Sequence, residues 1–358
     1  MKKLLFPLFS LIVGTTFALA LVEAGLRLLG VGYGNAPLES DPLLHHVHPK
    51  QYTFLSYTPN NEYGGFHVHY DKLGLRASTE TKHRVEQPAT CRIAFLGDSF
   101  TEAGQVRHEE SFVGLVEQKS DCEIRNYGVS SYSPIFFLAQ WRQTVKQYKP
   151  TTVIIQLFSN DISGDEEFKS IATLDAQGMP TAIPGPPNDW LSGALRNSYT
   201  ARLIRKSQIK LTWWMKSGQP ESVVGGFVEE NPDISPFSSN LMKTLFEEIR
   251  ASGAEFAMFV VPSKYRLANP RDNWPEQEFS DKWKHWAANN GVQAFVDVTG
   301  AFRRCMNKGQ FPFFRSDIHF NEIGHAIVAN KICHDLSRPL GIRNACDTSL
   351  AVPCLTTE

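Results

Sequence analysis

The chain has 358 residues, of which 42% are apolar, and a formal net charge of −1. This length and apolar fraction suffice for one large domain or for a domain with sizeable insertions. The near-neutral charge excludes the strongly basic balance that is typical of proteins that bind polyanions. We therefore expect a globular protein whose partners include no nucleic acid.

The first 30 residues are expected to lie outside the globular fold. Lys2 and Lys3 precede residues 4–22, which carry no charge and approach the length needed to cross a bilayer. Residues 18–20, Ala-Leu-Ala, resemble a signal-peptidase site, so a cleaved secretory signal and an uncleaved inner-membrane anchor both stay open. The apolar pattern continues past Ala20, which favours the anchor. Either interpretation places the remainder in the periplasm or outside the cell.

The six cysteines agree with export. They stand at positions 91, 122, 305, 333, 346 and 354, and no C-x-x-C spacing occurs among them. Disulfide bonds in an oxidising compartment are therefore favoured over a metal or redox site, although several could be ordinary buried thiols. We expect Cys91 to pair with Cys122, because each starts a strand and the two strands should be neighbours. Cys346 is expected to pair with Cys354 and close a short C-terminal loop.

Residues 31–90 are expected to form an N-terminal extension of irregular structure. Its histidines are His45, His46, His48, His67 and His69. Histidine clusters can bind metals, but this spacing fits no ligand pattern well, so surface or packing roles are favoured. Within the extension, residues 66–70 alternate like a half-exposed strand, and residues 71–76 resemble a turn.

From residue 91 onward, apolar strands alternate with amphipathic helices. Strands are expected at residues 92–96, 123–127, 151–158, 255–261 and 293–298. Helices are expected at residues 111–118, 136–148, 240–251, 276–289 and 321–337. This alternation indicates an α/β domain with a five-stranded parallel sheet in three α/β/α layers. The domain should span residues 91–340, and residues 341–358 should form a C-terminal tail.

The connection between Asp161 and the helix expected at residue 240 is too long for a plain loop. It contains a Pro/Gly-rich segment, residues 179–187, and an amphipathic basic stretch, residues 190–216. We expect an insertion at about residues 164–238. Two interpretations stay open: a lid or specificity element near the membrane surface, and a helix pair that only packs on the domain.

The first candidate catalytic residue is Ser99, which follows the apolar strand at residues 92–96. A serine at this place lies at the carboxyl edge of a parallel sheet, where the active sites of open α/β folds gather. Its hydroxyl needs a base to become a good nucleophile. His319 is the best candidate base, and Asp317 is suited to orient the imidazole and stabilise its charged form.

An ester-cleaving serine enzyme also needs donors for an oxyanion. The Ser99 backbone N–H is one candidate. Gly128, at the end of the second expected strand, lacks a Cβ, so its backbone N–H can approach a ligand closely. Asn160, at the end of the third strand, offers a side-chain amide.

These residues resemble a known family. Gly97-Asp98-Ser99, Gly128, Asn160-Asp161 and Asp317-x-His319 occur in the order of the four blocks of the SGNH, or GDSL-type, hydrolase superfamily. The chain is similar over roughly residues 91–336, and membrane-anchored bacterial members share its N-terminal apolar segment and a Gly74-Leu75-Arg76 stretch. The resemblance implies a flavodoxin-like three-layer fold, no metal or other cofactor, and ester hydrolysis or acyl transfer. It also implies that Ser99 is the nucleophile and that Gly128 and Asn160 complete the oxyanion hole.

Two positions depart from the family pattern. Phe158 stands where the third block usually has glycine, which alters the loop but leaves Asn160 in place. The acid commonly lies three residues before the histidine, where this chain has Ser316, whereas Asp317 lies two before it. A backbone carbonyl could orient His319 instead.

Three functions remain open at this point. The leading one is an extracytoplasmic serine esterase that removes acyl groups, O-acetyl above all, from glycans or other cell-envelope esters. The second is an O-acyltransferase that passes the acyl group to a sugar hydroxyl. The third is a non-catalytic glycan-binding or assembly component.

Overall fold

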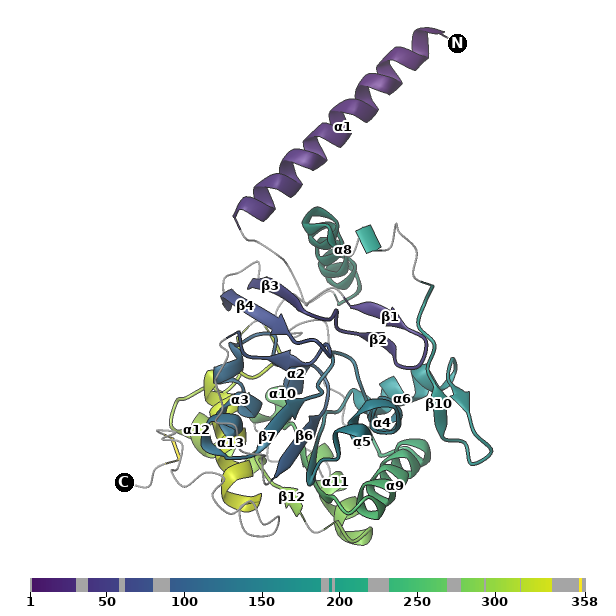
Figure 1. Ribbon diagram of the computed structural model, residues 1–358. Coiled ribbons are helices and arrows are strands. Elements are labelled where there is room, and N and C mark those ends of the chain that lie inside the picture. Colours follow the sequence, from purple (N-terminus) through teal and green to yellow (C-terminus); the bar gives the residue numbers. More distant parts are fainter. Residues whose placement is uncertain are drawn as a thin grey trace.

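A computed structural model gives the protein's fold (Figure 1). The structure describes residues 2–29, 38–57, 62–79, 91–187, 193–194, 197–217, 232–268, 278–292, 294–315, 317–336 and 354–355. Its centre is an eight-stranded sheet with the strand order β12-β11-β8-β6-β7-β5-β4-β3.

Five of these strands are parallel and form the half of the sheet that the sequence predicts. They are β6 (Arg92–Leu96), β7 (Glu123–Asn126), β8 (Thr152–Leu157), β11 (Glu255–Val260) and β12 (Ala294–Val296). Along β6 the side chains alternate between two hydrophobic cores: Ala94 and Leu96 belong to one, and Ile93 and Phe95 to the other. Both faces of the sheet are therefore buried, as expected for continuous apolar strands.

Helices cover both faces, so the predicted three-layer α/β/α arrangement is confirmed. The core around Ala94 is completed by α4 (Pro134–Gln140), α9 (Pro236–Ala251) and α11 (Phe279–Asn289). The core around Ile93 is completed by α3 (Phe112–Lys119), α12 (Thr299–Asn307) and α13 (Glu322–Leu336). After α4 the helical path continues through a π-helical turn, η2 (Trp141–Val145), and α5 (Lys146–Tyr148).

Local sequence sets the starts of these helices. The Ser111 hydroxyl accepts a hydrogen bond from the Gly114 N–H at the beginning of α3, and Ser235 caps α9 in the same way, just before Pro236. Serine caps satisfy N–H groups that have no partner within the helix, and proline suits the first helical position.

The predicted five-stranded parallel sheet is confirmed, but the expectation of an irregular extension is wrong, because the extension adds three antiparallel strands to that sheet. They are β3 (Tyr52–Tyr57), β4 (Gly64–Tyr70) and β5 (Arg76–Ala77), all antiparallel to their neighbours. Phe54, Val68 and Tyr70 bury one face of the β3–β4 hairpin. The strand predicted at residues 66–70 is thus the end of β4. The predicted turn is confirmed as well: Asp71 accepts hydrogen bonds from Leu73 N and Leu75 N.

The remaining elements lie around the sheet. They are α1 (Lys2–Leu28), β1 (Glu39–Asp41), β2 (His45–Val47), α2 (Ser99–Glu102), η1 (His108–Glu110), α6 (Asp161–Lys169), β9 (Thr173–Leu174), β10 (Pro180–Ala182), α8 (Tyr199–Ser217) and α10 (Lys264–Ala268). Two antiparallel ribbons pair β1 with β2 and β9 with β10. Residues 190–192 of the expected amphipathic stretch and most of the expected tail lie outside the described residues.

Helix α1 projects away from the rest of the protein (Figure 1). Its segment Phe9–Leu28 is long and apolar enough to cross a membrane, and none of it is buried in the protein. The end of α1 meets the start of α8. Glu23 accepts hydrogen bonds from Ser198 Oγ and Thr200 N, and Arg27 donates to the Asn197 carbonyl.

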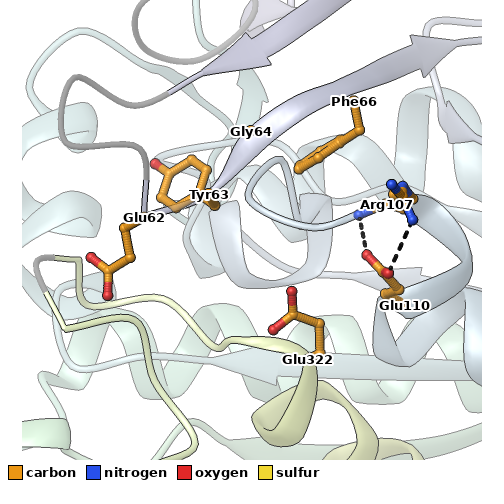
Figure 2. Close-up of a pocket in the computed structure, with 7 residues that line it drawn as sticks. All are labelled: Glu62, Tyr63, Gly64, Phe66, Arg107, Glu110 and Glu322. Atoms are coloured by element: carbon orange, nitrogen blue, oxygen red, sulfur yellow. Dashed lines mark hydrogen bonds and ion pairs between the residues drawn. The ribbon is translucent and has the colours of Figure 1, made fainter.

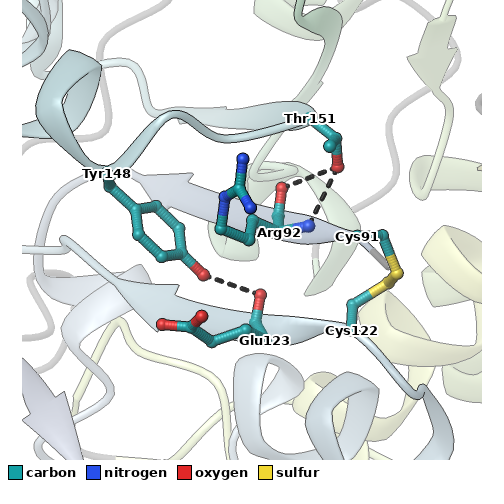
Figure 3. The surroundings of a disulfide bond; sticks show 6 residues. All are labelled: Cys91, Arg92, Cys122, Glu123, Tyr148 and Thr151. Carbon is teal, nitrogen blue, oxygen red and sulfur yellow. Dashed lines mark hydrogen bonds between the residues drawn. A yellow bond between two sulfur atoms is a disulfide. The ribbon is translucent and has the colours of Figure 1, made fainter. Parts of the chain in front are cut away.

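Two disulfides are described. Cys91–Cys122 joins the starts of β6 and β7, as predicted (Figure 3). The predicted Cys346–Cys354 pair is wrong, because Cys354 bonds to Cys305 on α12. Both Cys305 and Cys354 are buried in the core between the sheet and α13. Residue 354 is therefore bonded to the domain core and not to a neighbour in the tail. Cys346 lies outside the described residues.

Candidate active site

Ser99 is the first residue of α2, directly after β6 and the Gly97-Asp98 turn. Asp98 caps this helix, because its Oδ1 accepts a 2.8 Å hydrogen bond from Phe100 N. A side chain at Gly97 would collide with Thr101 and with Gln156. This tight turn places Ser99 at the carboxyl edge of the parallel strands, as the sequence indicates.

The structure brings the three sequence-derived candidates into one hydrogen-bonded chain. His319 Nε2 lies 2.7 Å from Ser99 Oγ. On the other side of the ring, His319 Nδ1 is hydrogen-bonded to Asp317 Oδ1. The same oxygen accepts a 3.0 Å hydrogen bond from the His319 backbone N–H. A carboxylate two residues before the histidine thus reaches the ring, and it takes the place that a backbone carbonyl would otherwise fill.

The charges around His319 suit a general base. Burial works to lower the pKa of His319, but the charge and hydrogen bond of Asp317 outweigh it, so the pKa is raised. Burial works to raise the pKa of Asp317, but His319 and the Tyr63 hydroxyl outweigh it and hold the pKa well below its usual range. The lowered pKa keeps Asp317 ionised, and an ionised carboxylate in contact with the ring favours the protonated form of His319.

Two residues that sequence reasoning missed hold Asp317. The Tyr63 hydroxyl donates a 3.0 Å hydrogen bond to Asp317 Oδ2. Lys264 Nζ donates to the Asp317 backbone carbonyl at 2.8 Å. Tyr63 belongs to the N-terminal extension and Lys264 begins α10. Neither residue stands in a motif, so no local signal in the sequence marks it.

The candidate oxyanion donors differ in their present partners. Asn160 follows β8, the strand next to β6, so it lies at the same sheet edge as Ser99. Gly128 packs against the backbone of Thr101, where a Cβ would collide, and its N–H donates a 2.9 Å hydrogen bond to Asn126 Oδ1. In this state, the Gly128 N–H is occupied by the protein itself.

Phe158, at the position where the family usually has glycine, packs against the residue that follows Ser99. Its ring lies 4.9 Å from that of Phe100, and the Phe100 ring lies 4.8 Å from the His319 imidazole. These aromatic contacts connect Phe158 to one side of the His319 ring. The difference from the family pattern leaves Asn160 at the strand end.

A buried carboxylate, Glu102, lies three residues after Ser99. It accepts hydrogen bonds from Tyr70 OH at 2.6 Å and from Ser130 N at 2.9 Å. His48 Nε2 lies 3.2 Å from it. Burial works to raise the pKa of Glu102, but His48 and the hydrogen bonds outweigh it and lower the pKa to about 2. His48 is therefore a buried ionic partner of this carboxylate, which neither a surface role nor simple packing describes.

Tyr63, the hydrogen-bond partner of Asp317, also lines a surface pocket of about 270 Å³ (Figure 2). Its lining residues are Glu62, Tyr63, Gly64, Phe66, Arg107, Glu110 and Glu322. Arg107 and Glu110 pair with each other at 3.6 Å. Tyr63 therefore both lines this pocket and donates a hydrogen bond to Asp317. Among the described residues, no group of three or more histidine, cysteine or acidic side chains is arranged to hold a metal ion.

Comparisons with known proteins give a family and a set of distant structures. The model of the GDSL-like Lipase/Acylhydrolase family matches residues 95–327. No curated protein sequence matches the chain. Axe2, an acetylxylan esterase from Geobacillus stearothermophilus, is 15% identical with a TM-score of 0.42, covering 70% of this chain and 96% of that chain. The psychrotrophic esterase EstA from Pseudoalteromonas sp. is 14% identical with a TM-score of 0.40, covering 70% and 98%.

Proposed function

The chain belongs to the GDSL-like lipase/acylhydrolase family and is an ester-hydrolysing enzyme, and from that premise we propose that Ser99, His319 and Asp317 carry out the reaction through an acyl-enzyme. The observation that carries the proposal is the continuous hydrogen-bonded chain from Ser99 Oγ through the His319 ring to Asp317. A serine, a base and an orienting carboxylate in contact are the parts of an activated nucleophile.

The first half of the reaction forms the acyl-enzyme. Ser99 Oγ attacks the acyl carbonyl carbon while His319 Nε2 takes the hydroxyl proton. The carbonyl oxygen becomes an oxyanion, and the electrons return when the ester C–O bond breaks. His319 then gives its proton to the leaving alcohol. Asp317 remains ionised throughout and stabilises the imidazolium.

In the second half a water molecule replaces the alcohol. His319 takes a proton from the water, and the resulting hydroxide attacks the acyl carbon. The bond between the acyl carbon and Ser99 Oγ breaks, the carboxylic acid leaves, and Ser99 Oγ recovers a proton from His319. The Ser99 N–H and the Asn160 amide are the proposed oxyanion donors in both halves. The Gly128 N–H would join them only if its bond to Asn126 is released or shared.

We further propose that the enzyme works outside the cytoplasm on O-acetyl esters of glycans or other cell-envelope molecules. Two observations support this location. The segment Phe9–Leu28 has the length and composition of a membrane span. The pairs Cys91–Cys122 and Cys305–Cys354 suit an oxidising compartment.

The surface pocket favours acyl transfer as a second candidate function. It shares Tyr63 with the hydrogen-bonded chain, and it combines the aromatic ring of Phe66 with carboxylates that can accept hydrogen bonds from sugar hydroxyls. A sugar held there would compete with water for the acyl group. The reaction would otherwise use the same acyl-enzyme.

A fluorophosphonate probe tests the proposal. The full-length protein in detergent is treated with the probe, and its intact mass is measured beside Ser99→Ala, His319→Ala and the control Ser159→Ala. Ser159 follows the neighbouring strand β8 and lies outside the hydrogen-bonded chain. We expect stoichiometric labelling of the wild type and the control only. Labelling of Ser99→Ala would refute the assignment of the nucleophile, and no labelling of the folded wild type would favour the non-catalytic alternative.

Mass spectrometry of the products separates hydrolysis from transfer. The protein is supplied with 4-nitrophenyl acetate, with and without a neutral oligosaccharide. Acetate as the only acetyl-containing product, beside the released 4-nitrophenol, supports the esterase. An acetylated oligosaccharide that depends on Ser99 supports the transferase.

A further inference from the structure

Asp317 contacts His319 in an unusual way. Asp317 Oδ1 binds both the backbone N–H and the ring of His319, two residues away. One oxygen thus serves two donors of the same residue within one short turn. Contacts at only one of its two oxygens would leave the carboxylate free to rotate about the Cβ–Cγ bond. A contact at the other oxygen is needed to fix the plane of the carboxylate.

Tyr63 supplies that second contact from outside the matched family region. Its hydroxyl donates to Asp317 Oδ2 at 3.0 Å, so each carboxylate oxygen has a fixed partner. The Tyr63 ring lies 4.8 Å from the Phe314 ring and packs in a small cluster with Ala103 and Val106. These contacts hold the phenol in place. Burial and the Asp317 charge raise the pKa of Tyr63, so the hydroxyl remains a donor.

Lys264 fixes the backbone on which Asp317 stands. It is buried, with 7% of its surface exposed. Its ammonium group donates to the carbonyls of Phe314 at 2.7 Å, Arg315 at 3.0 Å and Asp317 at 2.8 Å. An ammonium group has three N–H donors, and here each has a carbonyl of the same loop. Three carbonyls of this loop therefore bind one ammonium group.

We propose that Tyr63 and Lys264 are positioning residues, which together we call the acid brace, and that the acid brace holds Asp317 in the orientation that aligns His319 with Ser99. The inference rests on the proposed function, because it assumes that His319 is the base. It adds that residues from the N-terminal extension and from α10 compensate for an acid only two residues before the histidine. The hydrogen bond from Tyr63 also stabilises the Asp317 charge, so Asp317 raises the pKa of His319 less than it would without this bond.

Tyr63→Phe is the most direct test, because it removes the hydroxyl and keeps the ring against Phe314. Hydrolysis of 4-nitrophenyl acetate by the full-length protein in detergent is measured from pH 5 to 9. We expect kcat to fall by about 10- to 100-fold, the range for losing one hydrogen bond to a charged group. KM should change little. The acid limb of the pH profile should move to higher pH, because an unshared Asp317 charge raises the pKa of His319 further.

Tyr148→Phe is the matched control. The Tyr148 hydroxyl donates a 2.8 Å hydrogen bond to the Glu123 carbonyl at the start of β7, beside the Cys91–Cys122 disulfide (Figure 3). This place is at the opposite end of the parallel strands from Ser99. Tyr148→Phe should therefore leave both kcat and the acid limb unchanged.

Lys264→Met tests the second half of the acid brace. It keeps the length of the side chain but removes all three donors, so kcat should fall by more than in Tyr63→Phe. Because this variant could unfold, its thermal unfolding and its stoichiometry of fluorophosphonate labelling are measured alongside. A variant that is folded and labelled but hydrolyses slowly supports the proposal. Wild-type kcat in a folded Lys264→Met protein overturns the role of Lys264.

The outcomes separate the acid brace from the proposed function. If Ser99→Ala still hydrolyses the ester, the proposed function fails, and the acid brace fails with it. If Ser99→Ala is inactive while Tyr63→Phe keeps the wild-type kcat and pH profile, only the role of Tyr63 fails. A fall in Tyr63→Phe activity that is uniform across pH and equals the unfolded fraction would also overturn it, because a structural role alone gives that result.

Discussion

The Tyr70 hydroxyl donates a 2.6 Å hydrogen bond to the carboxylate of Glu102, three residues beyond Ser99. Strand β4 of the N-terminal extension is thereby fixed to the helix that begins with the proposed nucleophile. The same carboxylate accepts a hydrogen bond from Ser130 N, two residues beyond Gly128. One buried anion therefore joins the extension, the nucleophile helix and the loop that carries a candidate oxyanion donor.

Glu102→Ala should destabilise the protein strongly. The side chain is 2% exposed and receives hydrogen bonds from Tyr70 and Ser130. Removing it leaves buried donors without partners, so we expect the free energy of unfolding to fall by about 3–5 kcal/mol. Urea denaturation measures the change. Glu166→Ala, which removes an exposed side chain, should cost less than about 1 kcal/mol. Equal losses in the two variants would contradict a special role for Glu102.

The contribution of Glu102 to the free energy of unfolding should fall as the pH falls. Its pKa in the folded protein is about 2, below the ordinary value of 4.5, because His48 and the hydrogen bonds outweigh burial. A lowered pKa stabilises the folded state fully above the ordinary value, and this stabilisation is lost as the pH falls toward 2. The stability difference between wild type and Glu102→Gln should therefore shrink from pH 5 to pH 2. A difference that stays constant over this interval would argue against an ionised Glu102.

Asp317→Asn should slow the reaction and move its pH dependence. Activity requires neutral His319, whose pKa is raised because Asp317 outweighs burial, so activity is lost as the pH falls through that raised pKa. Removing the negative charge should move the acid limb of kcat/KM to lower pH. It should also reduce kcat by about 10²- to 10⁴-fold, because a neutral amide neither stabilises the imidazolium nor fixes the ring's tautomer as the carboxylate does. A pH–rate profile of the variant checks both, and an unmoved limb would refute the coupling.

Asp165→Asn should remove a loss of stability near neutral pH. Asp165 is buried and accepts hydrogen bonds from Ser133 Oγ at 2.8 Å and Ile135 N at 2.9 Å. Burial outweighs these bonds and raises its pKa to about 7. A raised carboxyl pKa stabilises the folded state below the ordinary value, near 3.8, and this stabilisation is lost as the pH rises to 7.

Thermal unfolding of the Asp165→Asn protein between pH 4 and 8 tests this expectation. The amide keeps one acceptor oxygen and cannot ionise, so the decline that wild type shows between pH 4 and 7 should become smaller. Glu166→Gln, next in the chain and exposed, is the matched control and should retain the wild-type decline. A decline of the same size in Asp165→Asn would exclude Asp165 as its source.

Opening the Cys305–Cys354 bond should free the end of the chain. The two cysteines are 49 residues apart in sequence, for which the loop-closure relation gives up to about 4 kcal/mol of stabilisation. Cys305→Ser combined with Cys354→Ser should lower the urea midpoint and expose the segment near residue 354 to limited proteolysis. Replacing Cys91 and Cys122 provides the comparison, since their shorter loop should contribute less. An unchanged midpoint would show that the end of the chain adds no stability.

The sequence predicts the alternating strands and helices of the domain and the candidate site residues that follow the strands. Of the five parallel strands, β6, β8, β11 and β12 are mainly apolar runs. Ser99 and Asn160 follow β6 and β8, so their common location at one sheet edge follows from the fold. Of the added antiparallel strands, the sequence indicates only the end of β4, at residues 66–70, and β5 has two residues, too few to show an alternating pattern. Their pairing with the sheet depends on contacts across distant parts of the chain, such as Arg76 with Asn126.

The same limit explains the wrong disulfide and the missed acid brace. Cys354 bonds to Cys305 because both are buried against α13, and no feature near either cysteine records this. Tyr63 and Lys264 contact the Asp317 loop from sequence positions far from it and far from each other. Single residues of this kind become recognisable only when the fold brings them together.

The antiparallel strands also bear on how the chain can be shortened. The family match begins at residue 95, beyond β3, β4 and β5. A fragment started there would lack β5, which pairs with β7 at Asn126, and the first three residues of β6, which pair with β7 on its other side. Both losses leave backbone N–H and C=O groups of β7 unpaired, and such open edges are templates for aggregation. The fragment would also lack Cys91, so Cys122 would become a lone thiol. Such a fragment could associate with its own copies both by strand addition and by intermolecular disulfides.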